Sequence, residues 1–323
     1  MVKNNNMKVL DLITRPELFQ GKGHLYNDKN YFEGWYFKIT NNNYSISFIP
    51  GINIDGIDNK AFIQVITNVS SYFVSYDIGD FEFSVDPFYI KIKNNLFSKN
   101  KMILDILDYS QSLKISGSIL FTNSQNINTT ALCPNIMGPF SYVPFMECKH
   151  AVLSMKNIVY GSIKINDNLL DFNSGLGYIE KDWGSSFPES YIWCQGNDFD
   201  NSDAGFMLAV TNIPFASFHF KGFICDIIVE NREFRFATYN NSKLVNCDID
   251  NTSLNVTLKK NKYIFNVTSA SNDSFKLLAP IKGKMEKDVF ESICSDVVVS
   301  LRKDNCLIFS GVSKNCGVEI VKD

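Results

Sequence analysis

The sequence predicts an all-β protein made of two tandem lipocalin-like antiparallel β-barrels that are related by internal duplication. Three observations predict this fold. Apolar and polar residues alternate with a period of two along much of the chain, clusters of Asn, Asp, Gly and Ser separate the alternating segments, and the second half of the chain repeats segments of the first half in the same order. Such alternation is typical of strands with one buried face, and the polar clusters supply the turn conformations that hairpins require.

Six segments show the alternation most clearly, and we expect a strand in each. They are "YSISF" (44–48), "FEFSV" (81–85), "YIKIK" (89–93), "LKISGSI" (113–119), "LNVTL" (254–258) and "DVVVSL" (296–301). Only "MKVLDLI" (7–13) and "KMEKDVFESI" (284–293) have a pattern compatible with short helices. Strands are therefore the expected main element.

Four pairs of segments match in the same order in the two halves of the chain. The first match is between the segment around Trp35 and the segment around Trp193, at an offset of 193 − 35 = 158. Each segment has a strand with Trp, an Asn-rich turn, an apolar strand and Ile-Pro. The other matches are "SKNKMILDI" (98–106) with "KKNKYIFNV" (259–267), "ECKHAVLSMK" (147–156) with "SICSDVVVSLRK" (292–303), and "GYIEKD" (177–182) with "VEIVKD" (318–323). Each match is weak alone, but four in one order would rarely arise by chance.

Each copy is about 150 residues long, which suits a barrel of about eight strands that closes its own edges and encloses one small ligand. The predicted organisation is an N-terminal extension over residues 1–24, a first barrel over residues 25–182 and a second barrel over residues 183–323. The segment 177–197 then spans the junction of the two barrels. Ligands often bind at domain junctions and at the mouths of barrels, so this segment is the first place to look for a site.

Composition excludes several classes of partner. The 31 basic and 34 acidic residues give a net charge of −3 without any Lys/Arg run, so nucleic acid is not expected to bind. The N-terminus lacks the apolar core of a secretion signal, and no stretch approaches the roughly 18 apolar residues of a membrane-spanning helix. We expect a cytoplasmic protein, with transient contact with a membrane surface left open. The 8 cysteines include no C-x-x-C pair, which indicates reduced core thiols rather than a metal site.

The junction also carries candidate catalytic acids. Glu180 and Asp182 would point to one face of a strand, and the residue between them to the other face. The repeat places Val321 where the first copy has Glu180, and a carboxylate at an apolar position suggests a specific task, although a solvent-exposed acid at the rim is the alternative. Glu33, on the matching first strand of the first barrel, has Tyr191 as its counterpart in the second.

Tryptophans and histidines have structural alternatives. Trp35 and Trp193 would be common as core residues of a barrel, whereas Trp183 lies between Asp and Gly, where a core is hard to build. The three histidines, at positions 24, 150 and 219, are isolated in the sequence, and each is expected to be a surface or satisfied core residue rather than a ligand. The sequence has no G-x-S-x-G, no H-E-x-x-H and no P-loop, so the standard hydrolase, protease and nucleotide functions are not predicted.

Two regions resemble the signature regions of the tocopherol cyclase family. They are "YFEGWYFKI" (31–39) followed by "SFIPG" (47–51), and "IEKDWGSSFPESYIWCQGN" (179–197). The resemblance implies a cyclase that closes a chromanol ring on a prenylated hydroquinone without a redox cofactor or a metal. It also implies kinship with two-domain lipocalin-like proteins, among them carotenoid hydratases, which act on isoprenoid double bonds.

Ring closure of this kind requires protonation of an unactivated alkene by a carboxylic acid that an apolar pocket keeps protonated. We predict that Asp182 is the general acid, with Glu180 and Glu33 as the alternatives. The tertiary cation that forms needs dry surroundings and aromatic faces. The candidates for these faces are Trp183, Trp193, Trp35 and Tyr36, and the residues predicted to orient the quinol hydroxyls are Gln195 and Asn197.

Two further functions remain compatible with these residues. A lipocalin-like carrier would hold a hydrophobic small molecule while the acids form hydrogen bonds or salt bridges at the rim, and a structural module would have filled barrels. A buried acid that faces an apolar cavity would favour chemistry, whereas a solvated acid paired with Lys or Arg would favour transport or a structural role.

Overall fold

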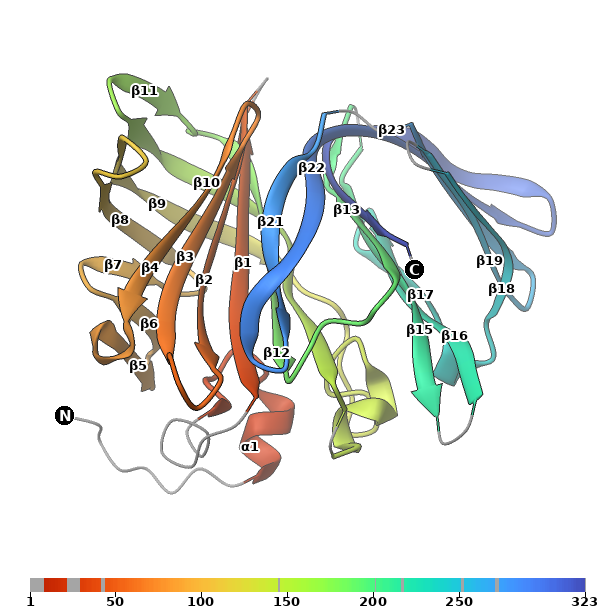
Figure 1. Ribbon diagram of the computed structural model, residues 1–323. Helices are drawn as coiled ribbons and strands as arrows, with labels where there is room; N and C mark the ends of the chain where they lie inside the picture. The colour runs from red at the N-terminus through yellow and green to blue at the C-terminus, as the bar shows by residue number, and fades with distance from the viewer. Residues whose placement is uncertain are drawn as a thin grey trace. The chain divides into compact units, whose positions relative to one another are not determined.

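The structure is a computed structural model that describes residues 9–21, 30–41, 44–144, 146–200, 202–215, 218–250, 253–270 and 273–322. Within these ranges the chain consists almost entirely of antiparallel strands in two sheets, with one short α-helix, α1 (Val9–Thr14) (Figure 1). The predicted all-β class with two lipocalin-like antiparallel sheets is therefore confirmed.

The first sheet has the strand order β4-β3-β2-β1-β12-β10-β9-β8-β7-β6-β5, and β11 pairs with β10. Its strands are β1 (Tyr31–Asn41), β2 (Tyr44–Ile54), β3 (Lys60–Thr67), β4 (Ser71–Asp77), β5 (Phe81–Val85), β6 (Phe88–Ile92), β7 (Asn95–Phe97), β8 (Lys101–Asp108), β9 (Leu113–Gln125), β10 (Cys148–Ile165), β11 (Asn168–Asp171) and β12 (Gly175–Gly184).

The second sheet has the order β17-β16-β15-β13-β23-β22-β20-β19-β18, with β14 on β23 and β21 on β22. Its strands are β13 (Tyr191–Gly196), β14 (Asp198–Phe199), β15 (Ala204–Phe215), β16 (Phe218–Val229), β17 (Arg232–Ala237), β18 (Lys243–Ile249), β19 (Ser253–Lys260), β20 (Tyr263–Ala270), β21 (Phe275–Ile281), β22 (Lys284–Lys303) and β23 (Cys306–Val321). Five of the six segments of clear alternation lie wholly in strands, and the sixth, 89–93, ends one residue beyond β6.

Each sheet starts and ends on strands that follow each other in the chain. In the first sheet, β4 and β5 are the two ends of the path and are joined through the 3-10 turn Ile78–Asp80. In the second, β17 and β18 are joined through Thr238–Asn240. Because each residue spans at most about 3.5 Å, the two edges of each sheet must approach each other, and the sheet must curl around its core. This shared order confirms the internal duplication.

The strand order corrects one of the four segment matches. By position in the sheet, β1 is equivalent to β13, β10 to β22 and β12 to β23, which agrees with three of the matches. Segments 98–106 and 259–267 are not equivalent, because β9 separates β8 from β10 whereas β20 pairs directly with β22. The similarity of these two Lys- and Asn-rich segments reflects composition and not position.

The match of Trp35 with Trp193 is wrong in register. Trp35 belongs to the interior cluster of the first sheet, whereas on β13 the interior residues are Ile192 and Cys194, so Trp193 lies on the opposite face. A shift of one residue in the alignment of two strands assigns every side chain to the opposite face of the sheet. The sheet pairs Tyr36 with Glu180 and Tyr191 with Val321, so Tyr191 is the counterpart of Tyr36 and not of Glu33.

The chain forms two compact units. The first comprises residues 1–187 and 277–288, and the second comprises residues 188–276 and 289–323. The excursion 277–288 is fixed to the first unit by Gln64 of β3, whose side-chain amide donates to the carbonyl of Leu278 (3.0 Å) and accepts from its N–H (2.9 Å). The predicted domain boundaries after residues 24 and 182 stay predictions.

One of the two expected helices is wrong. The helix expected over residues 7–13 is present in part as α1, whereas residues 284–293 begin the long strand β22. From residue 284 to residue 290 exposed positions alternate with more buried ones, which is the period of a strand and not of a helix.

The described residues contain no helix that is long and apolar enough to cross a membrane. All 8 cysteines are free thiols.

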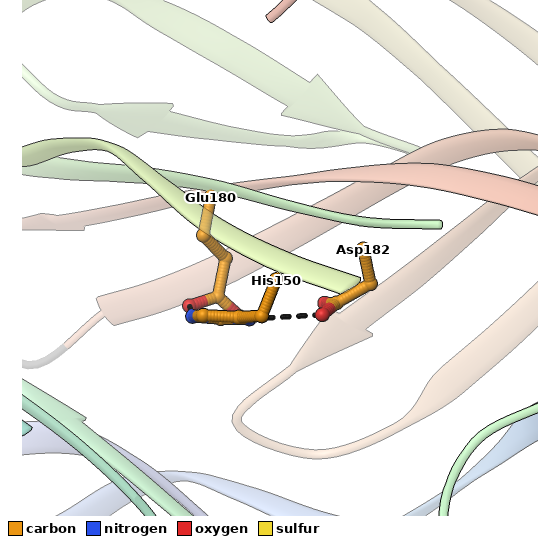
Figure 2. A group of neighbouring side chains, drawn as sticks. All are labelled: His150, Glu180 and Asp182. Carbon is orange, nitrogen blue, oxygen red and sulfur yellow. Dashed lines mark hydrogen bonds and ion pairs between the residues drawn. The ribbon is translucent and has the colours of Figure 1, made fainter. Parts of the chain in front are cut away.

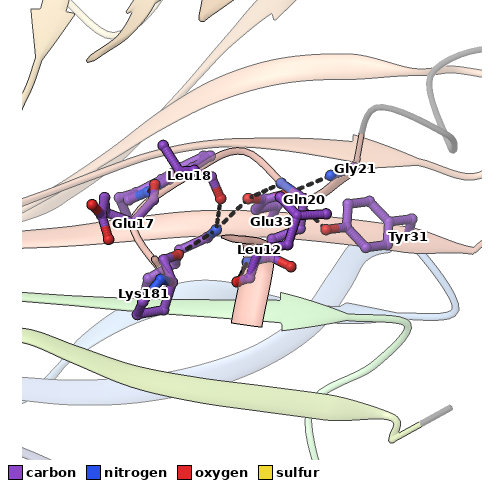
Figure 3. A network of polar contacts seen from close by, with 10 residues as sticks. Leu12, Glu17, Leu18, Gln20, Gly21, Tyr31, Glu33 and Lys181 are labelled. Carbon is purple, nitrogen blue, oxygen red and sulfur yellow. Dashed lines mark hydrogen bonds and ion pairs between the residues drawn. The ribbon is translucent and has the colours of Figure 1, made fainter. Parts of the chain in front are cut away.

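A buried ion pair fixes the segment after α1 to the first sheet (Figure 3). Lys181 of β12 lies 2.5 Å from Glu33 of β1, Nζ to Oε1, and both side chains are fully buried. The same ammonium group donates to the backbone carbonyls of Pro16 (2.9 Å) and Leu18 (2.6 Å). Burial lowers the pKa of Lys181, and the charge of Glu33 opposes this change.

Glu33, the other member of the ion pair, also forms hydrogen bonds with the segment after α1. Its carboxylate accepts hydrogen bonds from the backbone N–H groups of Gln20 and Gly21 and from the hydroxyl of Tyr31 (2.6 Å). The indole of Trp35 donates to the carbonyl of Glu17. Residues 16–21 are therefore held by donors and acceptors that belong to one buried pair.

Replacing Lys181 by Met should strongly destabilise the protein. The variant leaves the Glu33 carboxylate without its counter-ion and two buried carbonyls without a donor, which typically costs about 3 to 5 kcal/mol. Urea unfolding of Lys181→Met measures the loss, and Lys114→Met, at an exposed position of β9, is the matched control. Equal unfolding midpoints for the two variants would contradict the importance of the pair.

Candidate functional site

Strand β12 divides the candidate acids between two faces of the first sheet. Tyr178, Glu180 and Asp182 point to the outer face, away from the core cluster, while Ile179, Lys181 and Trp183 point to the interior. The sequence-based prediction that Glu180 and Asp182 share a face is therefore confirmed. The neighbouring strands add to the outer face the residues directly opposite, among them Gly34 and Tyr36 of β1 and His150 and Val152 of β10.

His150 joins the two carboxylates of the outer face into one cluster (Figure 2). Its Nδ1 lies 2.8 Å from Oδ1 of Asp182, and its Nε2 lies 3.6 Å from Oε2 of Glu180. The exposed fractions of the side chains are 5% for Glu180, 13% for His150 and 21% for Asp182. Glu180 is thus the buried member of the cluster, and Asp182 is the member that solvent reaches.

The charges of the cluster keep His150 protonated. Burial lowers the pKa of His150, but the negative charges of Asp182 and Glu180 and the hydrogen bond to Asp182 outweigh burial and raise its pKa to about 9. At neutral pH the imidazolium therefore bonds to Asp182 and lies beside Glu180. One positive charge faces two carboxylates, so the cluster has one carboxylate more than it has cations.

Two tyrosines extend the cluster along the outer face. The Tyr178 hydroxyl donates a 2.5 Å hydrogen bond to Oε2 of Glu180, and burial together with the charge of Glu180 raises the pKa of Tyr178 well above its usual value. The ring of Tyr36 lies edge-on to the ring of Tyr178 at 6.3 Å, and its hydroxyl accepts from Ser47 (2.7 Å). Glu180 therefore lies between an aromatic hydroxyl and an imidazolium.

The same three side chains have the ligand types of a cation site. One ligand atom from each of His150, Glu180 and Asp182 lies within 4.8 Å of the others, and an imidazole with two carboxylates suits several divalent metals. A metal would have to displace the proton that His150 holds, because a metal-bound imidazole nitrogen carries no proton. The sequence had indicated no clustered ligands, since the three residues are brought together only by the pairing of β10 with β12.

Glu33 lies on the other face, so the structure does not bring it to the cluster. The two indoles of the first unit also lie there: the ammonium group of Lys181 is 4.7 Å from the ring centroid of Trp35 and 4.8 Å from that of Trp183. The indoles therefore flank Lys181 through cation–π contacts and do not surround Asp182. Our expectation of an acid among tryptophans fails here, because the pleat turns residue 182 away from residues 181 and 183.

The remaining predicted site residues belong to the second unit. Trp193 and Gln195 lie on β13, with Asn197 just beyond its end, and all three are buried. On the same face, the hydroxyl of Tyr191 donates a 2.5 Å hydrogen bond to Glu319 of β23. The second unit thus has its own partly buried tyrosine–carboxylate pair on the strands equivalent to β1 and β12.

His150 is the residue of the candidate site that sequence reasoning missed. A lone histidine carries no spacing signal, and its partners lie 30 and 32 residues away on another strand, as 180 − 150 and 182 − 150. The segment "ECKHAVLSMK" was recognised as part of the repeat, but the repeat does not say which strand pairs with it. His24 and the side chain of His219 lie outside the described residues.

Two curled antiparallel sheets with a partly buried histidine–carboxylate cluster define a duplicated lipocalin-like protein with a candidate acid–base site. The sequence model of the tocopherol cyclase-like family matches residues 121–321, which is more than half of the chain. The chain belongs to the tocopherol cyclase-like family, and the resemblance noted from its two motifs is confirmed.

Solved structures share the fold at low sequence identity. CghA in complex with Sch210972 is 6% identical, with a TM-score of 0.57 over 90% of this chain and 88% of that chain. An AttH-like protein from Nitrosomonas europaea is 10% identical, with a TM-score of 0.51 over 92% of this chain and 94% of that chain. No curated protein sequence matches significantly. At these identities the likeness shows the fold alone.

We expect Asp182→Asn to lower the pKa of His150 from about 9 toward the ordinary value near 6.5, because the variant removes both a negative charge and a charged hydrogen-bond acceptor. An NMR titration of the imidazole carbons measures the change, and His150→Gln assigns the resonance. Glu286→Gln, at an exposed position, is the control and should leave the pKa in place. A His150 pKa near 6.5 in the unchanged protein would contradict the charge arrangement.

The raised pKa also predicts how stability depends on pH. Because the pKa of His150 is higher in the folded protein than its unfolded value near 6.5, its contribution is fully present below pH 6.5 and is lost as the pH rises through about 9. The difference in unfolding free energy between the unchanged protein and His150→Gln should shrink over that interval. Urea unfolding at pH 6, 7.5 and 9.5 measures it, and a constant difference would contradict the prediction.

Proposed function

We propose that this protein is a cofactor-independent acid–base enzyme that protonates a carbon–carbon double bond of a hydrophobic isoprenoid, such as a prenylated hydroquinone, and closes a ring through the phenol oxygen. The observation that carries this proposal is the cluster of His150, Glu180 and Asp182 on β10 and β12. Membership of the tocopherol cyclase-like family supports the class of reaction. The same proton transfer followed by attack of water would give a hydratase.

Glu180 is the carboxyl group best suited to donate the proton, a role that our sequence analysis gave first to Asp182. Of the two carboxyl groups beside His150, the more buried one is the better proton donor, because burial disfavours the charged form that it must leave and regain in each cycle. Asp182 is bonded to the imidazolium at 2.8 Å and reaches solvent, whereas Glu180 is 5% exposed and lies 3.6 Å from the same ring. Asp182 then serves as the ionised partner of His150.

Glu33 is poorly suited to the role that we listed as an alternative. Its carboxylate is bonded to the ammonium group of Lys181, to two backbone N–H groups and to the hydroxyl of Tyr31. These bonds occupy both carboxylate oxygens, and the side chain lies on the opposite face of the sheet from His150. We therefore assign Glu33 to the fold.

The exposed carboxylate and the histidine complete the reaction. Glu180 transfers its proton to the alkene, and a tertiary carbocation forms. The phenol oxygen attacks this cation, and the phenolic proton passes to Asp182. His150 lies between the two carboxylates and returns the proton from Asp182 to Glu180, so the reaction is an isomerisation that consumes nothing.

Aromatic rings of the outer face are the groups placed to stabilise the cation. Tyr36 and Tyr178 lie on the face that carries Glu180, whereas Trp35 and Trp183 lie on the other face of the sheet. Cation–π contacts with such rings contribute about 0.5 to 2 kcal/mol each. The predicted contributions of Trp193, Gln195 and Asn197 to substrate binding stay predictions.

Glu180→Gln should reduce turnover by about a factor of a thousand, because general acid catalysis typically contributes 10² to 10⁴. The assay incubates the protein with a geranyl-substituted hydroquinone in D₂O and follows the chromanol product by mass spectrometry. One non-exchangeable deuterium should enter each product molecule at the alkene carbon that receives the proton. Glu286→Gln is the matched control and should retain full activity.

Three outcomes separate the functions. Loss of activity in Asp182→Asn with full activity in Glu180→Gln would return the acid role to Asp182. A co-purified lipid without any turnover would support a carrier. A product without deuterium would contradict protonation of the alkene.

A further inference from the structure

Gly34 is a partly exposed position in the otherwise buried strand β1. From residue 31 to residue 40 every residue of β1 is buried except Gly34. On β12, every residue from 177 to 183 is buried except Asp182, and Gly34 and Asp182 are direct cross-strand partners. His150, the partner of Asp182 on β10, is also partly exposed. The three accessible positions form one row across three strands.

The fold does not require glycine at this position. Gly34 does not have a positive φ, and a Cβ atom added to it would meet only Cγ2 of Ile49 at 3.7 Å and a backbone oxygen at 3.9 Å, which are ordinary contacts. The next residue in the row, Gly51, is different, because its Cβ would come within 2.5 Å of the ring of Phe62. Packing explains Gly51, but it does not explain Gly34.

A missing side chain at position 34 leaves room directly beside the charged pair. A side chain on β1 at a cross-strand position has its Cβ about 4.5 to 5.5 Å from that of its partner, so any residue other than glycine would stand next to Asp182. The same face carries the partly exposed apolar side chain of Ile49 on one side of Gly34 and the Asp182–His150 pair on the other. The row therefore has an apolar end and a charged end.

We propose that Gly34 is the specificity-determining residue of this site: it admits the hydroxyl-bearing end of an apolar ligand to Asp182 and His150, and its lack of a side chain sets how wide that end can be. The ligand class is an apolar molecule that carries a phenolic or alcoholic hydroxyl, because Asp182 accepts a hydrogen bond and the apolar residues match a ring. This inference rests on the proposed function for the identity of the site. Access to residue 182 is testable without turnover.

The test introduces a thiol at the exposed acid and measures access to it. In Asp182→Cys, iodoacetamide should alkylate the introduced thiol, and peptide mass spectrometry separates this site from the native cysteines. Adding Gly34→Leu should slow this alkylation by about tenfold or more, because the reagent then reaches the thiol only through local opening of the strand. Gly34→Ala, whose added methyl group makes only ordinary contacts, should give a smaller reduction with an unchanged unfolding midpoint.

Gly79→Leu in the Asp182→Cys background is the matched control, because a Cβ at Gly79 meets nothing within 4 Å and the residue lies in the turn between β4 and β5. It should not change the alkylation rate. An alkylation rate that is the same with glycine, alanine and leucine at position 34 would overturn the proposal, whether or not the protein proves to be a cyclase.

A second measurement tests specificity itself. If the protein turns over prenylated hydroquinones, Gly34→Ala should lower kcat/KM more for quinols with a methyl group beside the hydroxyl than for unmethylated quinols. Equal losses for both would overturn the assignment of specificity to position 34. Absence of turnover in every variant, with the alkylation result as expected, would reject the proposed function but keep Gly34 as the entry to a ligand site.

Discussion

The pleat of strand β12 is the constraint on which the rest of the structure depends. Consecutive side chains of a strand point to opposite faces, so Lys181 is forced into the interior while Glu180 and Asp182 are forced out of it. The inner charge needs Glu33 and two backbone carbonyls, which fixes the segment after α1. The outer charges need His150, which fixes β10 beside β12. One strand thus separates the buried Lys181–Glu33 ion pair from the His150–Asp182 pair of the candidate site.

The two clusters show why similar residues have different roles. Glu33 is surrounded by a cation and by hydrogen-bond donors, so its carboxylate holds the segment after α1 to the sheet. Glu180 and Asp182 both lie beside the imidazolium of His150, so the cluster has two carboxylates for one cation. Neighbouring acid and base groups of this kind are the arrangement on which the proposed acid–base function rests.

The sequence predicted the strands, the duplicated order and the shared face of Glu180 and Asp182, because alternation and repetition are local patterns. It could not predict the role of His150, because the partners of His150 are set by the pairing of strands that are far apart in the chain. It also could not predict that Trp35 and Trp193 lie on opposite faces of their sheets, because an alignment shifted by one residue still shows the same alternation. The strand at 284–293 looked helical, because charged residues between apolar ones fit both periods over so short a stretch.

The bonds between Gln64 and Leu278 have a consequence for biosynthesis. Residues 277–288 belong to the first unit although nearly ninety residues of the second unit, 188–276, are translated before them. The amino-terminal half of the nascent polypeptide therefore leaves the ribosome without one of its own pieces and must wait for it, and contacts this distant in sequence form slowly. A fragment that ends at residue 187 would therefore lack residues 277–288 of the first unit, together with their bonds to Gln64.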